Sequence, residues 1–223
     1  MGPGIFDVLF EYWPIFLKGT IGTLKYAFIA VSFGTILGAF IAVGRLSKNK
    51  IISKIAEIYT TVIRGTPLLV QMYIFYFFLP IAFPALNKID KVYTVLMSLI
   101  LNSCAYVAEI IRAGIQSVDS GQMEAARSLG MTHKHAMTKI ILPQAVKNIL
   151  TSLANEYIAM IKETSLAGTF MLYELMYTRV LLANKYLVWQ PLFIIAIIYL
   201  IVTVVLSALV KLLEKRLAVS ERA

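Results

Sequence analysis

Within the long apolar stretches of the sequence stand five ionisable side chains: Arg64, Glu109, Glu156, Lys162 and Glu163. A charged group held in hydrocarbon costs about 3 kcal/mol or more unless it is paired or faces water, so each indicates a functional site. At about 100° of rotation per helical residue, Glu156 and Glu163 share one helix face, with Asn155 beside it. Such a polar stripe is expected to face a cavity.

Arg64 precedes Thr66 and Pro67, where a proline frees backbone groups of a helix. Its guanidinium and those groups together suit a carboxylate, which arginine binds through two parallel hydrogen bonds. The alternative is an arginine anchored at the inner lipid headgroups. Glu163 also has an alternative, a neutralising ion pair with Lys162 or with Arg64.

Other polar residues of these stretches have structural explanations. Glu109 and Arg112 are three residues apart, so an intrahelical ion pair accounts for both. Asn102 and Ser103 bind either a ligand or a neighbouring helix, and helix packing is the favoured interpretation. No metal site is expected, because the two histidines, two residues apart, point to different sides of a helix. The residues expected to bind a solute are Arg64, Thr66, Asn102, Asn155 and Glu163.

The apolar stretches are long enough to be membrane-spanning helices. Hydrophobic residues make up 59% of the chain and charged residues 15%, against about half and a quarter in a soluble globular domain. About 20 apolar residues cross the hydrocarbon core as a helix. The prediction is a single all-α membrane domain over 1–223. Its five transmembrane helices are expected at about 20–44, 58–84, 92–112, 145–170 and 187–212, with the second broken at Pro67.

Lysine and arginine gather in alternate connections between these stretches. They cluster after the first, between the third and fourth, and after the last. Basic loops mark the cytoplasmic side, so the N-terminus is expected outside and the C-terminus inside. The net charge of +9 then lies near anionic headgroups and needs no nucleic-acid partner. Cys104 is the only cysteine and can form no intrachain disulfide.

The cytoplasmic loop 119–143 has helical composition of its own. Asp119 or Ser120 can cap a first helix, and Gly130 is placed to end it in a left-handed conformation. Thr132 can cap a second short helix that runs to about residue 142, and Pro143 suits the first turn of the next span. Two short helices joined at a glycine predict a compact docking element.

The spacing of residues in this loop carries a family resemblance. Glu124-Ala125-Ala126, then Gly130, Ile140 and Leu142-Pro143 together resemble the EAA loop of bacterial ABC-importer permeases. Three further stretches are similar to the polar amino-acid branch of that family, the histidine and glutamine permease type. These are residues 64–71, 105–115 and 161–166.

The resemblance implies an ABC type I importer permease in the bacterial inner membrane. Its expected partners are a second permease copy, identical or related, an ATP-binding subunit dimer and an extracytoplasmic amino-acid-binding protein. The sequence has no Gly-x-x-x-x-Gly-Lys-Ser/Thr phosphate loop. The chain is therefore expected to be no enzyme and to hold no cofactor, with ATP and Mg²⁺ on the partner ATPase. The residues that the resemblance implies to couple this permease to the ATPase are Glu124, Ala125, Ala126, Gly130, Leu142 and Pro143.

An acidic Glu163 facing the transported amino acid would favour a cationic side chain, as in arginine, lysine or histidine, and repel glutamate. Two other classes of protein compete with this hypothesis. A passive channel or ion-coupled carrier needs no ATPase and leaves loop 119–143 unexplained. A non-transporting membrane sensor would use the loop to bind a signalling protein, and the polar stripe at Glu156 and Glu163 argues against it.

Overall fold

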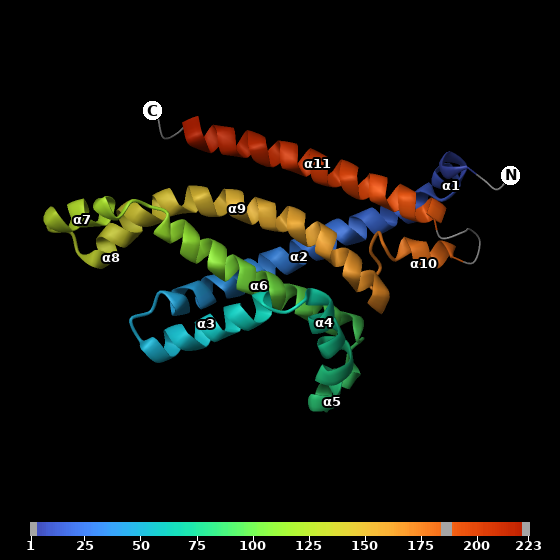
Figure 1. The fold of residues 1–223 in the computed structure, drawn as a ribbon, viewed down its shortest axis with the longest axis horizontal. Helices are drawn as coiled ribbons and strands as arrows, with labels where there is room; N and C mark the ends of the chain where they lie inside the picture. Colours follow the sequence, from blue (N-terminus) through green and yellow to red (C-terminus); the bar gives the residue numbers. More distant parts are fainter. Residues whose placement is uncertain (1–3, 184–188, 220–223) are drawn as a thin grey trace.

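The computed structural model describes residues 4–183 and 189–219, and every regular element in these two ranges is helical. Its longest helices are α2 (Trp13–Arg45), α6 (Val92–Gln116), α9 (Leu142–Glu163) and α11 (Trp189–Val219). Helix α2 packs on α6 and α9, and α9 also packs on α6 and α11. Figure 1 shows the long helices running lengthwise, with α7 and α8 at one end and α1 and α10 at the other.

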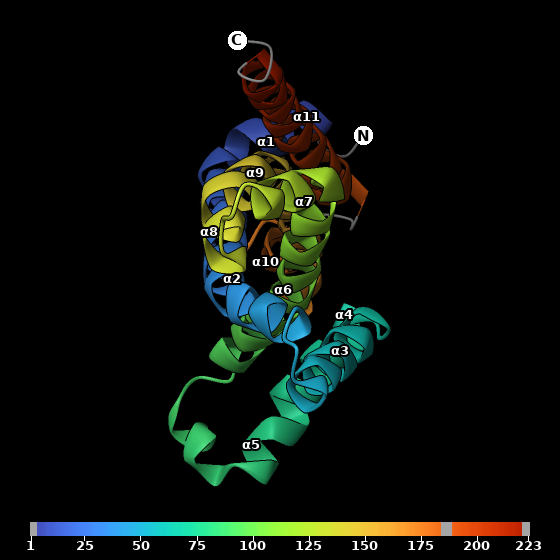
Figure 2. The same cartoon turned by 90° about the vertical axis from the view of Figure 1, so that its left-hand side faces the viewer.

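Shorter elements connect and flank this bundle. At the ends lie α1 (Ile5–Glu11), α7 (Ser120–Ser128), α8 (His133–Ala136) and α10 (Thr178–Leu182). Helix α3 (Lys50–Arg64) leads into α4 (Leu68–Tyr73), a π-helical turn (Ile74–Phe78), α5 (Leu79–Ala82) and a 3₁₀ turn (Pro84–Lys88). Seen from the side, the part of this segment around α5 projects away from the other helices (Figure 2).

Within the two described ranges, three helices are long and apolar enough to cross a membrane: Trp13–Arg45, Val92–Gln116 and Trp189–Lys215. A fourth crossing is available if α3 and the segment Leu68–Ala82 form one span, and these are bent by 101° at Gly65–Pro67. The predicted break at Pro67 is confirmed. Helix α9 does not reach the same apolarity, although it packs against α2, α6 and α11. The count of five spans therefore stays a prediction.

Several helices differ by a few residues from the predicted bounds of the spans. The first span begins at Trp13 rather than 20, because Lys18 interrupts the apolar run but not the helix, and Pro14 suits its first turn. The third continues to Gln116 rather than 112. The fourth segment begins at Leu142 rather than 145 and ends at Phe170, the predicted residue, with a 3₁₀-helix after Glu163. The predicted start of the last span, at 187, lies outside the described residues.

Small residues let α2 and α6 approach closely. A Cβ atom on Gly34 would lie 2.8 Å from the Cβ of Ser103, and one on Gly38 would lie 2.9 Å from the backbone oxygen of Cys104. Such contacts between small residues are the usual means of close helix packing in membranes. The contact fixes α6, which carries Asn102, against α2.

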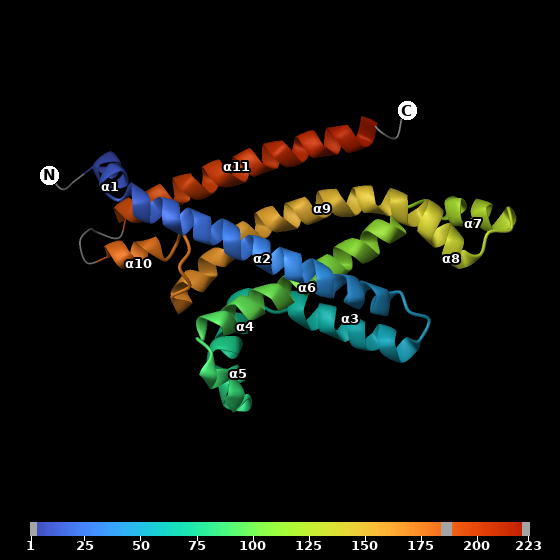
Figure 3. The same ribbon diagram turned by 180° about the vertical axis from the view of Figure 1, so that it is seen from behind.

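Two apolar clusters hold the helices together. One joins α2, α4, α6 and α9 and includes Ala27, Met72, Leu99 and Ile161. The other lies at the α1 end and joins α1, α2 and α11 with the loop before α10. Most of the apolar surface of α11 faces outward, and only 11% of its most apolar stretch is buried. Outward-facing apolar residues suit contact with lipid. Figure 3 shows α11 along the margin of the bundle.

Candidate functional site

A cavity of about 520 Å³ lies at the bend between α3 and α4. Its walls come from that bend, from the middle of α6 and from the C-terminal part of α9. Its volume falls within the range of about 300–1,000 Å³ typical of small-ligand sites. The polar residues of this main cavity are Arg64, Thr66, Asn102, Tyr106, Glu156 and Glu163.

The residues predicted to bind a solute do not all meet here. Arg64, Thr66, Asn102 and Glu163 line the main cavity, but Asn155 does not. Its side-chain nitrogen donates to the backbone oxygen of Thr151 at 3.2 Å, on an exposed part of α9. The stripe of Glu156 and Glu163 does face the cavity, which is what their helical spacing predicts.

The bend that forms one wall is held by Gln71, which the sequence analysis did not single out. Its side-chain nitrogen lies 2.8 Å from the backbone oxygen of Ile63 and 3.1 Å from that of Thr66. Its side-chain oxygen accepts from the Asn102 side chain at 3.2 Å. Gln71 thus satisfies carbonyl groups freed by Pro67 and ties the bend to α6.

The two carboxylates of the main cavity differ in their partners. Ser103 donates to Oε1 of Glu156 at 3.1 Å. Glu163 is exposed to the cavity, and no ion pair or hydrogen bond joins its carboxylate to another side chain in the part of the chain that the structure describes. The alternative pairings of Glu163 with Lys162 or Arg64 are absent from this part. Its carboxylate is accessible to a cationic ligand.

A second cavity of about 410 Å³ adjoins the main one. It is lined by the C-terminal half of α6 and the N-terminal half of α9, and we call it the inner cavity because both segments lead to loop 119–143. Arg64 and Tyr106 line both cavities. The guanidinium carbon of Arg64 lies 5.3 Å from the centre of the Tyr106 ring, within the range of a cation–π interaction.

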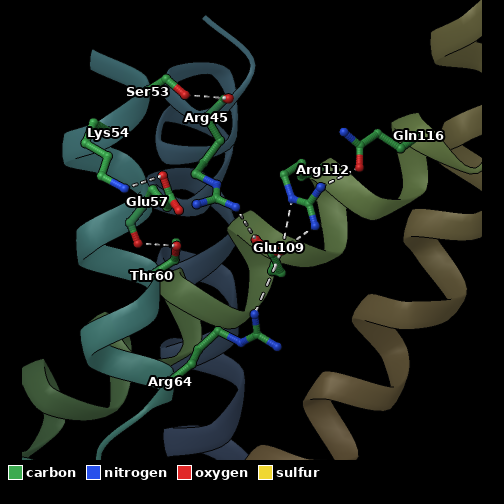
Figure 4. Close-up of polar contacts among 9 residues, drawn as sticks. All are labelled: Arg45, Ser53, Lys54, Glu57, Thr60, Arg64, Glu109, Arg112 and Gln116. Atoms are coloured by element: carbon green, nitrogen blue, oxygen red, sulfur yellow. Dashed lines mark hydrogen bonds and ion pairs between the residues drawn. The ribbon is translucent and has the colours of Figure 1, made fainter. Parts of the chain in front are cut away.

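Three arginines surround Glu109 at the edge of the inner cavity (Figure 4). Arg112 donates through Nε to Glu109 Oε1 at 2.9 Å, so the predicted intrahelical ion pair is confirmed. Arg45 of α2 lies 3.7 Å from Oε2, and Arg64 of α3 lies 3.9 Å from Oε1. The sequence analysis missed these two partners, because nothing in local spacing relates α2 or α3 to Glu109.

The loop 119–143 has the predicted caps. Asp119 Oδ1 accepts from the backbone nitrogen of Gly121 at 2.7 Å, and Thr132 Oγ1 accepts from that of His135 at 3.3 Å. Gly130 has a φ of +84°, which glycine adopts without strain. The apolar side chain of Leu129 is 85% exposed beside it. Together α7 and α8 form the projecting end of the molecule in Figure 1.

The second loop helix differs from the prediction. It was expected to be a separate helix running to about residue 142, but α8 ends at Ala136 and passes through a π-helical turn, Met137–Ile141, directly into α9. Pro143 lies in the first turn of α9, as predicted. A π turn widens the helix just where the proline ring would clash with the preceding turn, so the helix continues without a break.

Outside the helices, the loop before α10 contains a buried acidic residue that the sequence analysis did not single out. Glu174 is fully buried and accepts from the backbone nitrogens of Met176 and Tyr177, both at 2.7 Å, and from the Tyr199 hydroxyl at 2.9 Å. Burial raises the pKa of Glu174 to about 7, although these hydrogen bonds favour the ionised form. Glu174 joins this loop to α11 and, through Thr23, to α2.

Long apolar helices enclosing a polar cavity define a multi-pass membrane protein of the transport class. No group of three or more potential metal ligands occurs within residues 4–183 and 189–219. The chain belongs to the family of binding-protein-dependent transport system inner membrane components, which matches residues 34–219.

Curated relatives match over nearly the whole chain. A glutamine transport system permease protein of Rickettsia bellii is 41% identical and covers 97% of this chain and 100% of its own. The arginine transport system permease protein ArtQ of Bacillus subtilis is 38% identical, covering 92% of this chain and 93% of its own.

Solved structures agree with this family. The crystal structure of an amino acid ABC transporter with histidines matches with a TM-score of 0.88 and 43% identity, covering 97% of this chain and 100% of that one. An inward-facing methionine ABC transporter, at 15% identity and a TM-score of 0.68, shares the fold. This chain is therefore the permease component of an amino-acid ABC importer and a multi-pass protein of the bacterial inner membrane. Relatives of this kind are membrane subunits rather than enzymes, and the family implies a partner ATPase and a binding protein.

Proposed function

We propose that this permease imports amino acids with a cationic side chain, of the arginine, lysine or histidine type. The observation that carries the proposal is the charge of the main cavity, which presents one guanidinium, Arg64, and two carboxylates, Glu156 and Glu163. A basic amino acid has the opposite set, one carboxylate and two cations. A neutral amino acid would leave one carboxylate of the cavity without a counter-charge, which costs free energy in a site partly removed from water.

Arg64 is the group that binds the substrate carboxylate in this proposal. Its side chain is 42% exposed and its contact with Glu109, at 3.9 Å, is longer than a hydrogen bond. It is thus available for the paired hydrogen bonds that arginine makes to carboxylates. Thr66 and Asn102, which are already hydrogen-bonded to Gln71, shape the wall beside it. Asn155 has no part in this site, because it lies outside the main cavity.

Substrate class is tested with Glu163→Gln in the complete transporter, assembled with its ATPase and binding protein and reconstituted in vesicles. Uptake of labelled arginine should fall by about tenfold or more, and uptake of glutamine should change less. The matched control is Glu57→Gln, because Glu57 pairs with Lys54 on an exposed face of α3 and lines neither cavity. Equal losses for the two amino acids, or no loss, would refute the role of Glu163.

Glutamine is a second candidate substrate. The relatives favour it, since the Rickettsia bellii protein named for glutamine is 41% identical and the Bacillus subtilis protein named for arginine is 38% identical. Competition decides between the two. Excess unlabelled arginine should abolish uptake of labelled lysine, and excess glutamine should leave it unchanged. Uptake of glutamine alone by the wild-type transporter would make glutamine the substrate.

Coupling to a separate ATPase, with ATP and Mg²⁺ bound there, is also part of the proposal. Support comes from the exposed positions of Glu124, Ala125 and Leu129 on loop 119–143, which leave the loop open to another protein. Glu124→Lys should abolish ATP-dependent uptake while the permease still folds and inserts. A passive channel or ion-coupled carrier would instead transport without the ATPase and ignore this change. The permease copies are proposed to form a homodimer, which the mass of the purified complex would test.

A further inference from the structure

Two cavities lie one after the other between α6 and α9, and the proposed function uses only the first. The residues of α6 that line the main cavity include Asn102, whereas those lining the inner cavity extend from Tyr106 to Ser117. Asn102 and Glu109 are separated by about 10 Å along a helix that rises ~1.5 Å per residue. The inner cavity is therefore displaced toward loop 119–143, at the cytoplasmic end.

The inner cavity is polar enough and large enough for a free amino acid. Its volume of about 410 Å³ lies within the range of small-ligand sites. Asn148 and Ser152 of α9 and Ser117, directly after α6, line it together with Arg64. Asn148 donates to the Ser117 hydroxyl at 2.9 Å, whereas the Ser152 hydroxyl has no hydrogen-bond partner among the residues that the structure describes. A ligand there would meet both uncharged hydrogen-bonding groups and a guanidinium.

Arg64 and Tyr106 are the two residues that line both cavities. The guanidinium lies over the Tyr106 ring, so a change of side-chain rotamer is enough to turn it from one cavity toward the other. No movement of a whole helix is needed. The same cation can therefore contact an anionic group on either side of Tyr106.

The charges around Glu109 make such a movement of Arg64 inexpensive. Three arginines face one carboxylate, so two positive charges are in excess. Glu109 keeps its 2.9 Å hydrogen bond from Arg112 when Arg64 leaves. The Arg64 contact is the longest of the three, at 3.9 Å, and Arg64 is the most exposed of these arginines. Glu109 is then a weak competitor for Arg64, well suited to exchange with a substrate carboxylate.

We infer that the inner cavity is a second binding site for the transported amino acid on its way to the cytoplasm. Arg64 binds the α-carboxylate in both cavities, and Glu109 competes with that carboxylate for Arg64 and so promotes release. This inference rests on the proposed function, but it concerns the α-carboxylate that all amino acids share and holds for arginine or glutamine as substrate.

Protection of single cysteines from a thiol reagent tests the second site. The native cysteine, which is buried in α6, is first replaced by serine (Cys104→Ser), so that each variant carries a single thiol on the permease. Ala159→Cys then reports on the main cavity, Ser152→Cys on the inner cavity, and Lys48→Cys, in the exposed turn between α2 and α3, is the control. Each variant is purified as the complete complex with its ATPase. The probes are arginine and agmatine, which is arginine without the α-carboxylate, or glutamine and its decarboxylated analogue if the wild type carries glutamine.

The intact amino acid, at about ten times its Kd, should slow labelling of both Ala159→Cys and Ser152→Cys by about twofold, because only empty sites react and one Arg64 serves a single cavity at a time. The decarboxylated analogue should not protect Ser152→Cys, and neither compound should protect Lys48→Cys. Adding Glu109→Gln should lower the concentration that half-protects Ser152→Cys by about fivefold, the upper range for a partly exposed ion pair. It should also slow uptake at saturating substrate. Glu57→Gln should do neither.

Each contrary result has a separate meaning. Protection at Ala159→Cys without protection at Ser152→Cys would overturn the second site while the proposed function stands. Equal protection by the decarboxylated analogue would overturn the role of Arg64, and weaker protection after Glu109→Gln would overturn the competition. Absence of ATP-dependent amino-acid uptake by the wild-type complex would overturn the proposed function and this inference together.

Discussion

Replacing Gln71 by leucine should destabilise the permease without changing the size of the side chain much. Gln71 is only 6% exposed, and it bonds the backbone oxygens of Ile63 and Thr66 and the Asn102 side chain. A leucine can make none of these bonds. The 101° bend that forms one wall of the main cavity would then lose the side chain that satisfies its carbonyl groups.

The size of the effect follows from the groups left unpaired. Each buried polar group without a partner costs about 1–3 kcal/mol. Thr66 and Asn102 line the main cavity, so water can replace part of what they lose, and the net cost is about 2 kcal/mol. For a chain of this length such a loss lowers the melting temperature by roughly 4–8 °C. Transport should fall as well, because the bend positions Arg64.

A thiol-reactive fluorogenic dye measures this stability with the native protein. Cys104 is the only cysteine and is buried, so the dye reacts when the bundle unfolds. The matched control is Gln144→Leu, because Gln144 is exposed and its side chain bonds only the oxygen of Ile140 in its own helix. Its effect should stay within about 0.5 kcal/mol. A melting temperature for Gln71→Leu equal to that of Gln144→Leu would refute the assigned role of Gln71.

Three further outcomes are expected. Gly38→Ala should destabilise the permease by about 1–3 kcal/mol, because its Cβ would lie 2.9 Å from the backbone oxygen of Cys104. The control Gly44→Ala, whose Cβ meets nothing closer than 3.4 Å, should not destabilise it. Equal melting temperatures of the two variants in the dye assay would contradict this prediction. Folding stability should fall as pH rises from about 4.5 to 7 and then level off, because buried Glu174, with its pKa raised to about 7, keeps a proton that the unfolded chain has lost. The total loss of unfolding free energy over this pH range is at most roughly 3 kcal/mol, and Glu174→Gln should remove this pH dependence. The same pH profile of the melting temperature in Glu174→Gln and wild type would contradict the prediction. Gly130→Ala, at a φ of +84°, should cost about 1 kcal/mol and reduce ATP-dependent uptake, whereas Gly130→Asn should be milder; uptake rates decide whether that order holds.

Local sequence signals predicted much of the fold because they act over one or two helical turns. The caps at Asp119 and Thr132, the left-handed Gly130 and the break at Pro67 all depend on neighbouring residues alone. Long apolar runs predicted α2, α6 and α11 for the same reason. Helix ends were predicted less well, because hydropathy does not mark where a helix such as α2 begins. The π turn before α9 had no signal other than Pro143 itself.

The candidate site was predicted in part. A helical repeat placed Glu156 and Glu163 on one face, and rarity of charge in apolar segments singled out Arg64. Tyr106 could have been found, since it lies one helical turn after Asn102 on α6. Gln71 had a weaker signal, a polar residue soon after a helix break. Asn155 was placed beside the polar face by its position in sequence, and the structure turns it away from the cavity.

By itself the sequence determined the class of this protein, its main helical segments and the charged groups that need a partner or water, and it predicts an orientation across the membrane. These follow from the cost of placing charge in hydrocarbon and from hydrogen bonding within single helices. Only the tertiary structure decided which charges meet. Arg45 and Arg64 reach Glu109 from helices far away in the chain, and the two cavities exist because α3, α6 and α9 converge on Arg64 and Tyr106. Contacts between distant segments depend on how whole helices pack, and no local pattern encodes that packing.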